Sequence, residues 1–229
     1  MKRFAIAAPL LFLLLLSAQP ACAAQNLQQV LQQLDRAASN FRSASAEFEF
    51  KNIQTEPVPN TDIMTGVVYY EHHGGELRMA AHIKKRDGQP FGAVYTYDHG
   101  VFQLYNKQLN QVRKMQNATN LAAYLALGAG ASGQQLQDMF ELTYLGQETI
   151  DGVMTEKLQL IPKAQKARNM FPKITIWVDP ARDVYLKQVF DEGQGMSRIC
   201  TYTHIQFNHP IGADKFTFRT NRKTQFLNQ

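Results

Sequence analysis

The sequence contains very few cysteines: among its 229 residues there are two, Cys22 and Cys200. Cys22 lies in an N-terminal stretch with the features of an export signal, so Cys200 alone would remain in the exported chain. One cysteine cannot form an intramolecular disulfide. We therefore expect an exported domain that depends on its hydrophobic core for stability, and the chain is long enough for one domain with a sizeable core.

Long hydrophobic runs are also scarce. The longest, Phe4–Leu16, follows the basic residues Lys2 and Arg3 and precedes the small-residue sequence Ala21-Cys22-Ala23. This run is too short for a comfortable transmembrane helix, whereas the three features together are typical of a cleavable signal peptide. We expect residues 1–24 to be the signal peptide and residues 25–229 to form a single domain.

Cys22 also allows a second interpretation, in which it is the lipid-modified cysteine of a lipoprotein. The residues before it, Gln19-Pro20-Ala21, lack the branched apolar residue that such sites usually carry. Ordinary cleavage is therefore the expectation, and an acylated Cys22 remains the alternative.

Basic residues are not concentrated anywhere in the chain. The formal net charge is +5, and it falls to +3 once Lys2 and Arg3 of the leader are removed. The densest cluster, Lys84-Lys85-Arg86, is followed by Asp87-Gly88, which is typical of a solvated hairpin tip. Scattered charge of this kind provides no basic patch, so we expect no nucleic-acid partner.

The motifs of the common enzyme classes are missing as well. There is no nucleophile elbow, zincin motif or phosphate loop. Gly128, Gly130 and Gly133 match the letters of a dinucleotide fingerprint, but they follow an apolar helical segment and no βαβ unit surrounds them. We expect these three glycines to form a flexible hinge, and we expect no cofactor.

Two candidate catalytic groupings have simpler explanations. Cys200 and His204 are four residues apart on one expected strand, about 13 Å, which is too far for a thiolate and its base. Glu47 and Glu49 point the same way, as the polar side of any half-buried strand does. We expect neither grouping to be catalytic.

A metal site is the third alternative. His72, His73 and His82 could combine with Glu71 or Glu76, but adjacent residues of a strand point to opposite faces. A turn at this position would relax that constraint. We expect no metal site and no enzymatic activity.

The chain is rich in short β-strand patterns. One amphipathic helix is expected at Asn26–Phe41, with Asn26 as its N-cap. We expect a loop at Gln54–Thr65, a basic loop at Pro162–Met170, and short helices at Asn120–Leu127 and Gln134–Phe140. The expected strands are residues 43–51, 66–71, 76–83, 91–97, 101–105, 108–115, 141–145, 146–151, 153–161, 173–178, 184–190, 197–207 and 215–219.

Connections between these strands are short, which makes neighbouring strands antiparallel. The predicted fold class is therefore α+β and mostly β: a strongly curved antiparallel sheet with helices on one face. Such a sheet, with an N-terminal helix and a glycine-hinged helical insertion, has more covering elements than a tight core needs. It can enclose an apolar cavity.

The order and spacing of several segments resemble the periplasmic outer-membrane lipoprotein carriers of the LolA type. The resemblance covers Leu31–Phe218. The segments that carry it are LDRAASNFRSASAEFEFK (34–51), GVVYYEHHGGELRM (66–79), YDHGVFQLYNKQLNQV (97–112), KITIWVDPARDVYLKQVFDE (173–192) and IGADKFTF (211–218).

The resemblance implies an incomplete β-barrel that helices close as a lid, in the periplasm of a Gram-negative-type envelope. Its cavity would hold the acyl chains of a lipoprotein or another lipid, received from an inner-membrane transporter and delivered to an outer-membrane receptor by a monomeric carrier. The residues expected to line it are Leu31, Leu34, Phe48, Phe50, Val68, Tyr70, Leu77, Met79, Tyr95, Phe102, Leu104, Leu121, Tyr124, Leu125, Ile174 and Ile176.

One feature departs from the family pattern. Its members have a functional arginine in the hairpin where this chain has His72-His73, and Arg78 follows a few residues later. Two alternatives to the carrier also remain: a lipid-binding receptor or envelope sensor of the same fold, favoured if Cys22 is acylated, and an exported enzyme using histidine and carboxylate groups.

Overall fold

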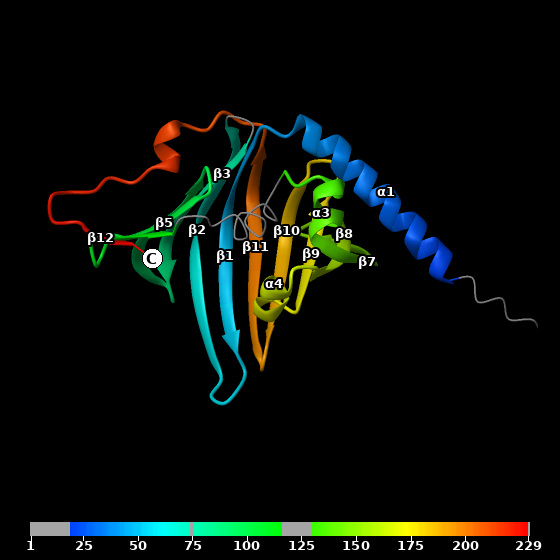
Figure 1. Cartoon of the computed structure of the whole chain (residues 1–229), viewed down its shortest axis with the longest axis horizontal. Helices are drawn as coiled ribbons and strands as arrows, with labels where there is room; N and C mark the ends of the chain where they lie inside the picture. Colours follow the sequence, from blue (N-terminus) through cyan, green and yellow to red (C-terminus); the bar gives the residue numbers. More distant parts are fainter. Residues whose placement is uncertain (1–18, 74–75, 116–129, 229) are drawn as a thin grey trace, which may run out of the picture.

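The computed structural model describes residues 19–73, 76–115 and 130–228 (Figure 1). The helices are α1 (Gln19–Asn40), α3 (Gly133–Met139), α4 (Gln165–Met170) and the 3-10 helix η2 (Ala213–Phe216). The strands are β1 (Ser43–Gln54), β2 (Asn60–His73), β3 (Glu76–Arg86), β4 (Gln89–Asp98), β5 (Val101–Asn106), β6 (Gln111–Met115), β7 (Phe140–Ile150), β8 (Val153–Pro162), β9 (Lys173–Asp179), β10 (Val184–Gly193), β11 (Met196–Phe207) and β12 (Gln225–Asn228).

All the strands belong to one twelve-stranded sheet with the order β12-β6-β5-β4-β3-β2-β1-β11-β10-β9-β8-β7. Two antiparallel meanders, β1–β6 and β7–β11, meet where β1 pairs with β11. The sheet curves but does not close, because β7 and β12 form its two ends (Figure 1). This confirms the predicted fold class, a mostly β half-open barrel.

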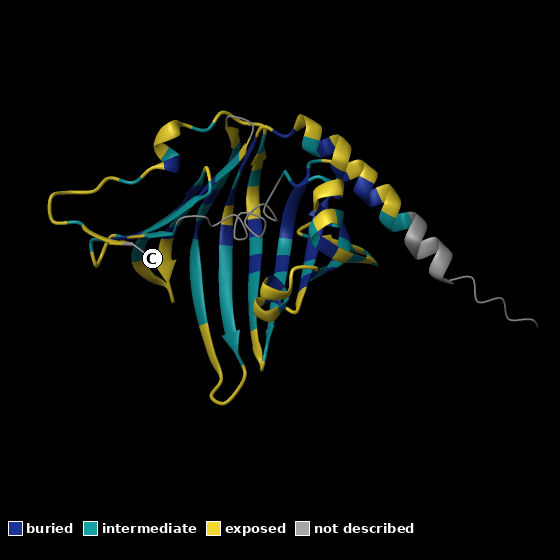
Figure 2. Cartoon of the chain, viewed as in Figure 1, coloured by how far each residue is buried: buried dark blue, intermediate teal, exposed yellow. Residues whose placement is uncertain are grey.

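Helix α1 packs one stripe of its surface onto the sheet. Val30, Leu31 and Leu34 are buried, while the polar residues between them are exposed (Figure 2). Together with Leu136 of α3 they cover Leu158, Leu160 and the isoleucines of β9 in one core cluster. The spacing of the stripe is the helical period that the sequence predicts.

A second core cluster lies on the same face of the sheet, which we call the inner face. Its members come from β1–β4, β10 and β11 and include Phe48, Val68, Met79 and Tyr202. The strand register shows that the clusters share this face: Ile176 of the first lies opposite Gln188, which in turn lies opposite Cys200 of the second. The helices therefore fill one half of the inner face.

Several expected boundaries are wrong. Helix α1 starts at Gln19, so Asn26 lies inside it and cannot be its N-cap; the alanines at 21, 23 and 24 favour this extension. Strand β2 already begins at Asn60, within the expected loop. The two strands expected at residues 141–151 are one strand, β7, with a register shift at Gly146, whose φ is 102°.

The basic loop expected at Pro162–Met170 contains helix α4. The strand expected at Lys215–Arg219 is wrong too: its first residues form η2, and the last strand is β12, which pairs in parallel with β6. The helix expected at Asn120–Leu127 lies outside the described residues. No helix in the described part of the chain has the length and hydropathy to cross a bilayer.

Candidate functional site: an apolar cavity on the inner face

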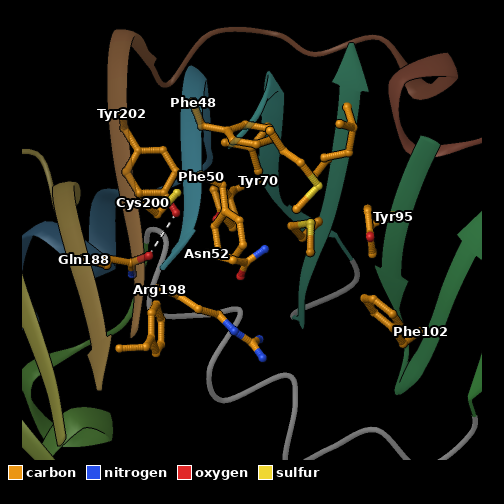
Figure 3. A pocket seen from close by; sticks show the side chains of 16 residues that line it. Phe48, Phe50, Asn52, Tyr70, Tyr95, Phe102, Gln188, Arg198, Cys200 and Tyr202 are labelled. Atoms are coloured by element: carbon orange, nitrogen blue, oxygen red, sulfur yellow. Dashed lines mark hydrogen bonds between the residues drawn. The ribbon is translucent and has the colours of Figure 1, made fainter. Parts of the chain in front are cut away.

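The half of the inner face that α1 and α3 do not cover contains a cavity of about 470 Å³ (Figure 3). Strands β1, β2, β3, β4, β5, β10 and β11 all contribute side chains to it. Its lining residues are Phe48, Phe50, Asn52, Met64, Val68, Tyr70, Met79, Ala81, Ile83, Tyr95, Phe102, Gln188, Phe190, Arg198, Cys200 and Tyr202. Most of these side chains are apolar or aromatic, as in sites for small hydrophobic ligands.

Strand register explains why these side chains meet. One row of directly paired residues crosses the inner face from β8 to β2: Leu158, Ile176, Gln188, Cys200, Phe50 and Met64. The first two lie beneath the helices and are fully buried. The other four line the cavity. One continuous surface is thus packed at one end and hollow at the other.

A buried polar group lies within this lining. The Tyr202 hydroxyl donates a hydrogen bond of 2.9 Å to Oε1 of Gln188 (Figure 3). Burial raises the pKa of the Cys200 thiol to about 12 and also raises that of the Tyr70 phenol. A thiol with that pKa is protonated at neutral pH and is a poor nucleophile. His204 is not its base, because the exposed His204 side chain pairs at 3.2 Å with Glu47, whose strand neighbour Phe48 lines the cavity on the other face of the sheet.

The structure places the expected lining residues in three groups. Phe48, Phe50, Val68, Tyr70, Met79, Tyr95 and Phe102 line the cavity. Leu77 and Leu104 pack against the same core cluster, whereas Leu31, Leu34, Ile174 and Ile176 belong to the cluster beneath α1 and α3. Leu121, Tyr124 and Leu125 lie outside the described residues, as does Gly128, which was expected in the hinge.

Sequence reasoning missed the part of the lining that comes from β10 and β11. Gln188, Phe190, Arg198, Cys200 and Tyr202 all line the cavity. The alternation along β11 does place Arg198, Cys200 and Tyr202 on one face. Arg198 is charged, Tyr202 carries a hydroxyl and Cys200 is small. The sequence pattern of β11 therefore does not identify this face as apolar.

Two of the expected hinge glycines lie at close contacts. A Cβ atom on Gly130, which has a φ of 77°, would lie 2.8 Å from the Phe41 ring, and one on Gly133 would lie 2.4 Å from the Leu31 carbonyl oxygen. Gly133 begins α3, and Leu31 belongs to α1. These glycines allow the segment before β7 to approach α1 closely.

The histidines of the alternative metal site point in different directions. The His72 ring packs 5.3 Å from that of Phe41, whereas Nε2 of His82 lies 2.6 Å from the Lys215 carbonyl oxygen. No group of three His, Cys, Asp or Glu side chains in the described ranges is arranged to hold a metal ion.

Arg78 lies on the outer face of the sheet, since its strand neighbour Met79 lines the cavity. Its Nε donates to Glu71 at 2.9 Å, and its guanidinium lies 4.1 Å from the centre of the Phe216 ring in η2. Arg78 therefore holds the C-terminal segment against the back of the barrel.

One buried carboxyl group lies close to α1. Asp183, in the turn between β9 and β10, is fully buried, and neither side-chain oxygen has a hydrogen-bond partner in the described structure. Burial, with a contribution from the negative charge of Asp35 in α1, raises its pKa to about 8. Asp183 is therefore mostly neutral at pH 7.

No family model matches the sequence. An uncharacterized protein of Methanocaldococcus jannaschii, MJ0687, is 27% identical over 121 residues, which is 53% of this chain and 33% of that protein. The match thus spans a third of the length of this curated relative.

Solved structures share the fold. An uncharacterized conserved protein from Thermus thermophilus superposes with a TM-score of 0.56 at 12% identity, over 90% of this chain and 100% of that one. MucB superposes with a TM-score of 0.53 at 15% identity, over 91% of this chain and 66% of MucB. The half-open barrel with helices on its inner face is the architecture implied by the resemblance to LolA-type carriers, and the chain has a LolA-like fold.

Proposed function

We propose that this protein binds the acyl chains of lipoproteins or other lipids in the inner-face cavity and carries them through the periplasm towards the outer membrane. The observation that supports this most strongly is the cavity itself, an apolar space of about 470 Å³ in a sheet that does not close. Each methylene group buried there would contribute about 0.8 kcal/mol to binding. The proposed role is non-catalytic.

Delivery requires a source and an acceptor. An inner-membrane transporter and an outer-membrane receptor are the proposed partners of a monomeric carrier. The open sheet supports this, because its end strands, β7 and β12, are not hydrogen-bonded to each other and the cavity is not enclosed by a complete barrel.

Filling the cavity tests the proposal. Ala81 lines it from β3, so Ala81→Trp places an indole in the space that the acyl chain would occupy. We expect this variant to take up a fluorescent fatty acid at least about tenfold more weakly, since several methylene groups would lose their site. Lys84→Trp, at an exposed position of the same strand, is the matched control. Equal uptake by wild type and both variants would contradict the proposal.

Mass spectrometry of the exported protein tests the localisation and distinguishes carrier from receptor. We expect a mature N-terminus at Ala24 or Gln25 without lipid. A diacylglyceryl group on an N-terminal Cys22 would show a membrane-anchored lipoprotein and would favour the receptor.

A further inference from the structure

The cavity lining changes from apolar to polar along the strands. Asn52 of β1 and Arg198 of β11 are directly paired, and both line the cavity. The next pair on the same face, Phe50 with Cys200, is apolar, and Cys200 is buried whereas Arg198 is half-buried (Figure 3). A ligand with a polar group at one end and hydrocarbon at the other matches this gradient.

Arg198 can bind more than it does in the structure. Its Nε forms an ion pair with Glu192, and its guanidinium lies 5.6 Å from the centre of the Phe171 ring. In the described part of the chain, Glu192 is the acidic residue that forms an ion pair with Arg198. The side chain is 43% exposed and lines the cavity (Figure 3). A guanidinium has five N–H donors, so Arg198 can hold Glu192 and a second anion together.

The size of the cavity limits how much hydrocarbon enters. A methylene group is close to a water molecule in size, and a water molecule occupies about 30 Å³ of the liquid. The volume of about 470 Å³ thus accommodates one acyl chain of ordinary length, not a bundle of chains.

We propose that the preferred ligand is a single-chain amphiphile with an anionic head, a carboxylate or a phosphate. Its head binds Arg198 and the second amide N–H of Asn52, whose Nδ2 also donates to Asp62 Oδ2 at 3.3 Å, and its chain extends past Phe50 towards Tyr202. Arginine suits such a head because its planar N–H groups match both anions. This inference rests on the proposed function, since it assumes that hydrocarbon fills the cavity.

Ligands that share one chain and differ in the head test the charge. Palmitate, lysophosphatidic acid, hexadecanol and hexadecyltrimethylammonium, each below its micelle concentration, would displace the neutral fluorescent probe N-phenylnaphthylamine. We expect both anions to bind about tenfold more tightly than the alcohol, as one hydrogen bond to a charged group would give, and the cation to bind most weakly. The tighter anion identifies the source of the head, a free fatty acid or a lysophospholipid.

Variants at the polar end of the cavity test which residues bind the anionic head group of the ligand. Arg198→Gln should remove the preference for anions and leave hexadecanol unchanged, whereas Arg198→Lys should keep part of it. Glu192→Gln should strengthen anion binding, because it removes a competing carboxylate. Arg222→Gln, at an exposed site in the C-terminal segment, is the matched control. Circular dichroism would verify that each variant is folded.

The outcomes separate this inference from the proposed function. Equal affinity for palmitate and hexadecanol, or an equal loss of both in Arg198→Gln, would overturn the head-group assignment while the cavity still bound hydrocarbon. Native mass spectrometry should show one ligand per protein, and two or three would overturn the single chain. If no ligand displaced the probe, the proposed function itself would fail.

Discussion

The hydroxyl of Tyr202 and the side-chain oxygen of Gln188 are joined by a 2.9 Å hydrogen bond across β11 and β10, and both residues are buried. A buried acceptor that loses its donor retains the full cost of its desolvation. This bond therefore fixes a polar contact between two buried residues of the cavity lining.

Replacing Tyr202 with phenylalanine should lower the free energy of unfolding by about 1–3 kcal/mol, because the ring remains while Gln188 loses this donor. Urea unfolding followed by the fluorescence of the single tryptophan, Trp177, would measure the change. Tyr105→Phe is the control, since its hydroxyl lies 3.4 Å from Asn110 in a partly buried position. Equal losses of unfolding free energy in the two variants would show that the Tyr202–Gln188 hydrogen bond contributes no more to stability than the Tyr105–Asn110 contact does.

Alanine at position 133 should force α3 away from α1. The new Cβ would lie 2.4 Å from the Leu31 carbonyl oxygen, a backbone atom that cannot rotate away. We expect a loss of about 1–3 kcal/mol, the usual cost of overpacking, seen as a lower thermal midpoint. Gly92→Ala is the comparison, because its Cβ would meet only the flexible Lys107 side chain at 3.2 Å. An unchanged midpoint in Gly133→Ala would mean that the two helices separate freely.

Asp183 should make the protein less stable as pH rises. Its folded-state pKa, about 8, is above its ordinary value of 3.8, so between these values the folded state holds a proton that the unfolded state has released. Linkage then lowers the unfolding free energy by up to about 1.4 kcal/mol per pH unit, and the loss levels off above the folded-state pKa.

Asp183→Asn removes this titration, so the stability of the variant relative to wild type should increase from about pH 4 to about pH 8. Urea unfolding at several pH values would measure it. Asp151→Asn, at the exposed turn between β7 and β8, is the control. A constant difference between Asp183→Asn and wild type would mean that the Asp183 carboxyl ionises in the folded state as it does in the unfolded chain.

Local patterns predicted most of the strands because their signals lie within a few residues. The alternation of Ala44, Ala46, Phe48 and Phe50 with polar residues predicts β1, and the structure buries the first three and half-buries Phe50. Helix α4 gave no such signal, since its N-cap residue, Ala164, makes no side-chain capping hydrogen bond. Strand β12 is defined by a parallel partner more than a hundred residues away, which no local pattern encodes.

The sequence predicted an apolar cavity on the sheet, but it predicted only some of the residues that line it. Strand periodicity identifies which side chains share a face, and the structure brings Val68, Tyr70 and Met79 together in the lining of one cavity. It cannot show which half of that face the helices cover. Ile174 and Ile176 look like cavity residues in the sequence, yet α1 and α3 pack over their part of the sheet. That difference depends on long-range packing, as does the position of Arg198.

The ends of the sheet, β7 and β12, are not hydrogen-bonded to each other. The diameter of a closed barrel is fixed, because a wider barrel would require the backbone hydrogen bonds between two of its strands to break. In this open sheet, bending alone can change the distance between the two ends, while the hydrogen bonds between all neighbouring strands stay intact. The cavity proposed to hold an acyl chain would thus adjust its width to that chain without any loss of secondary structure.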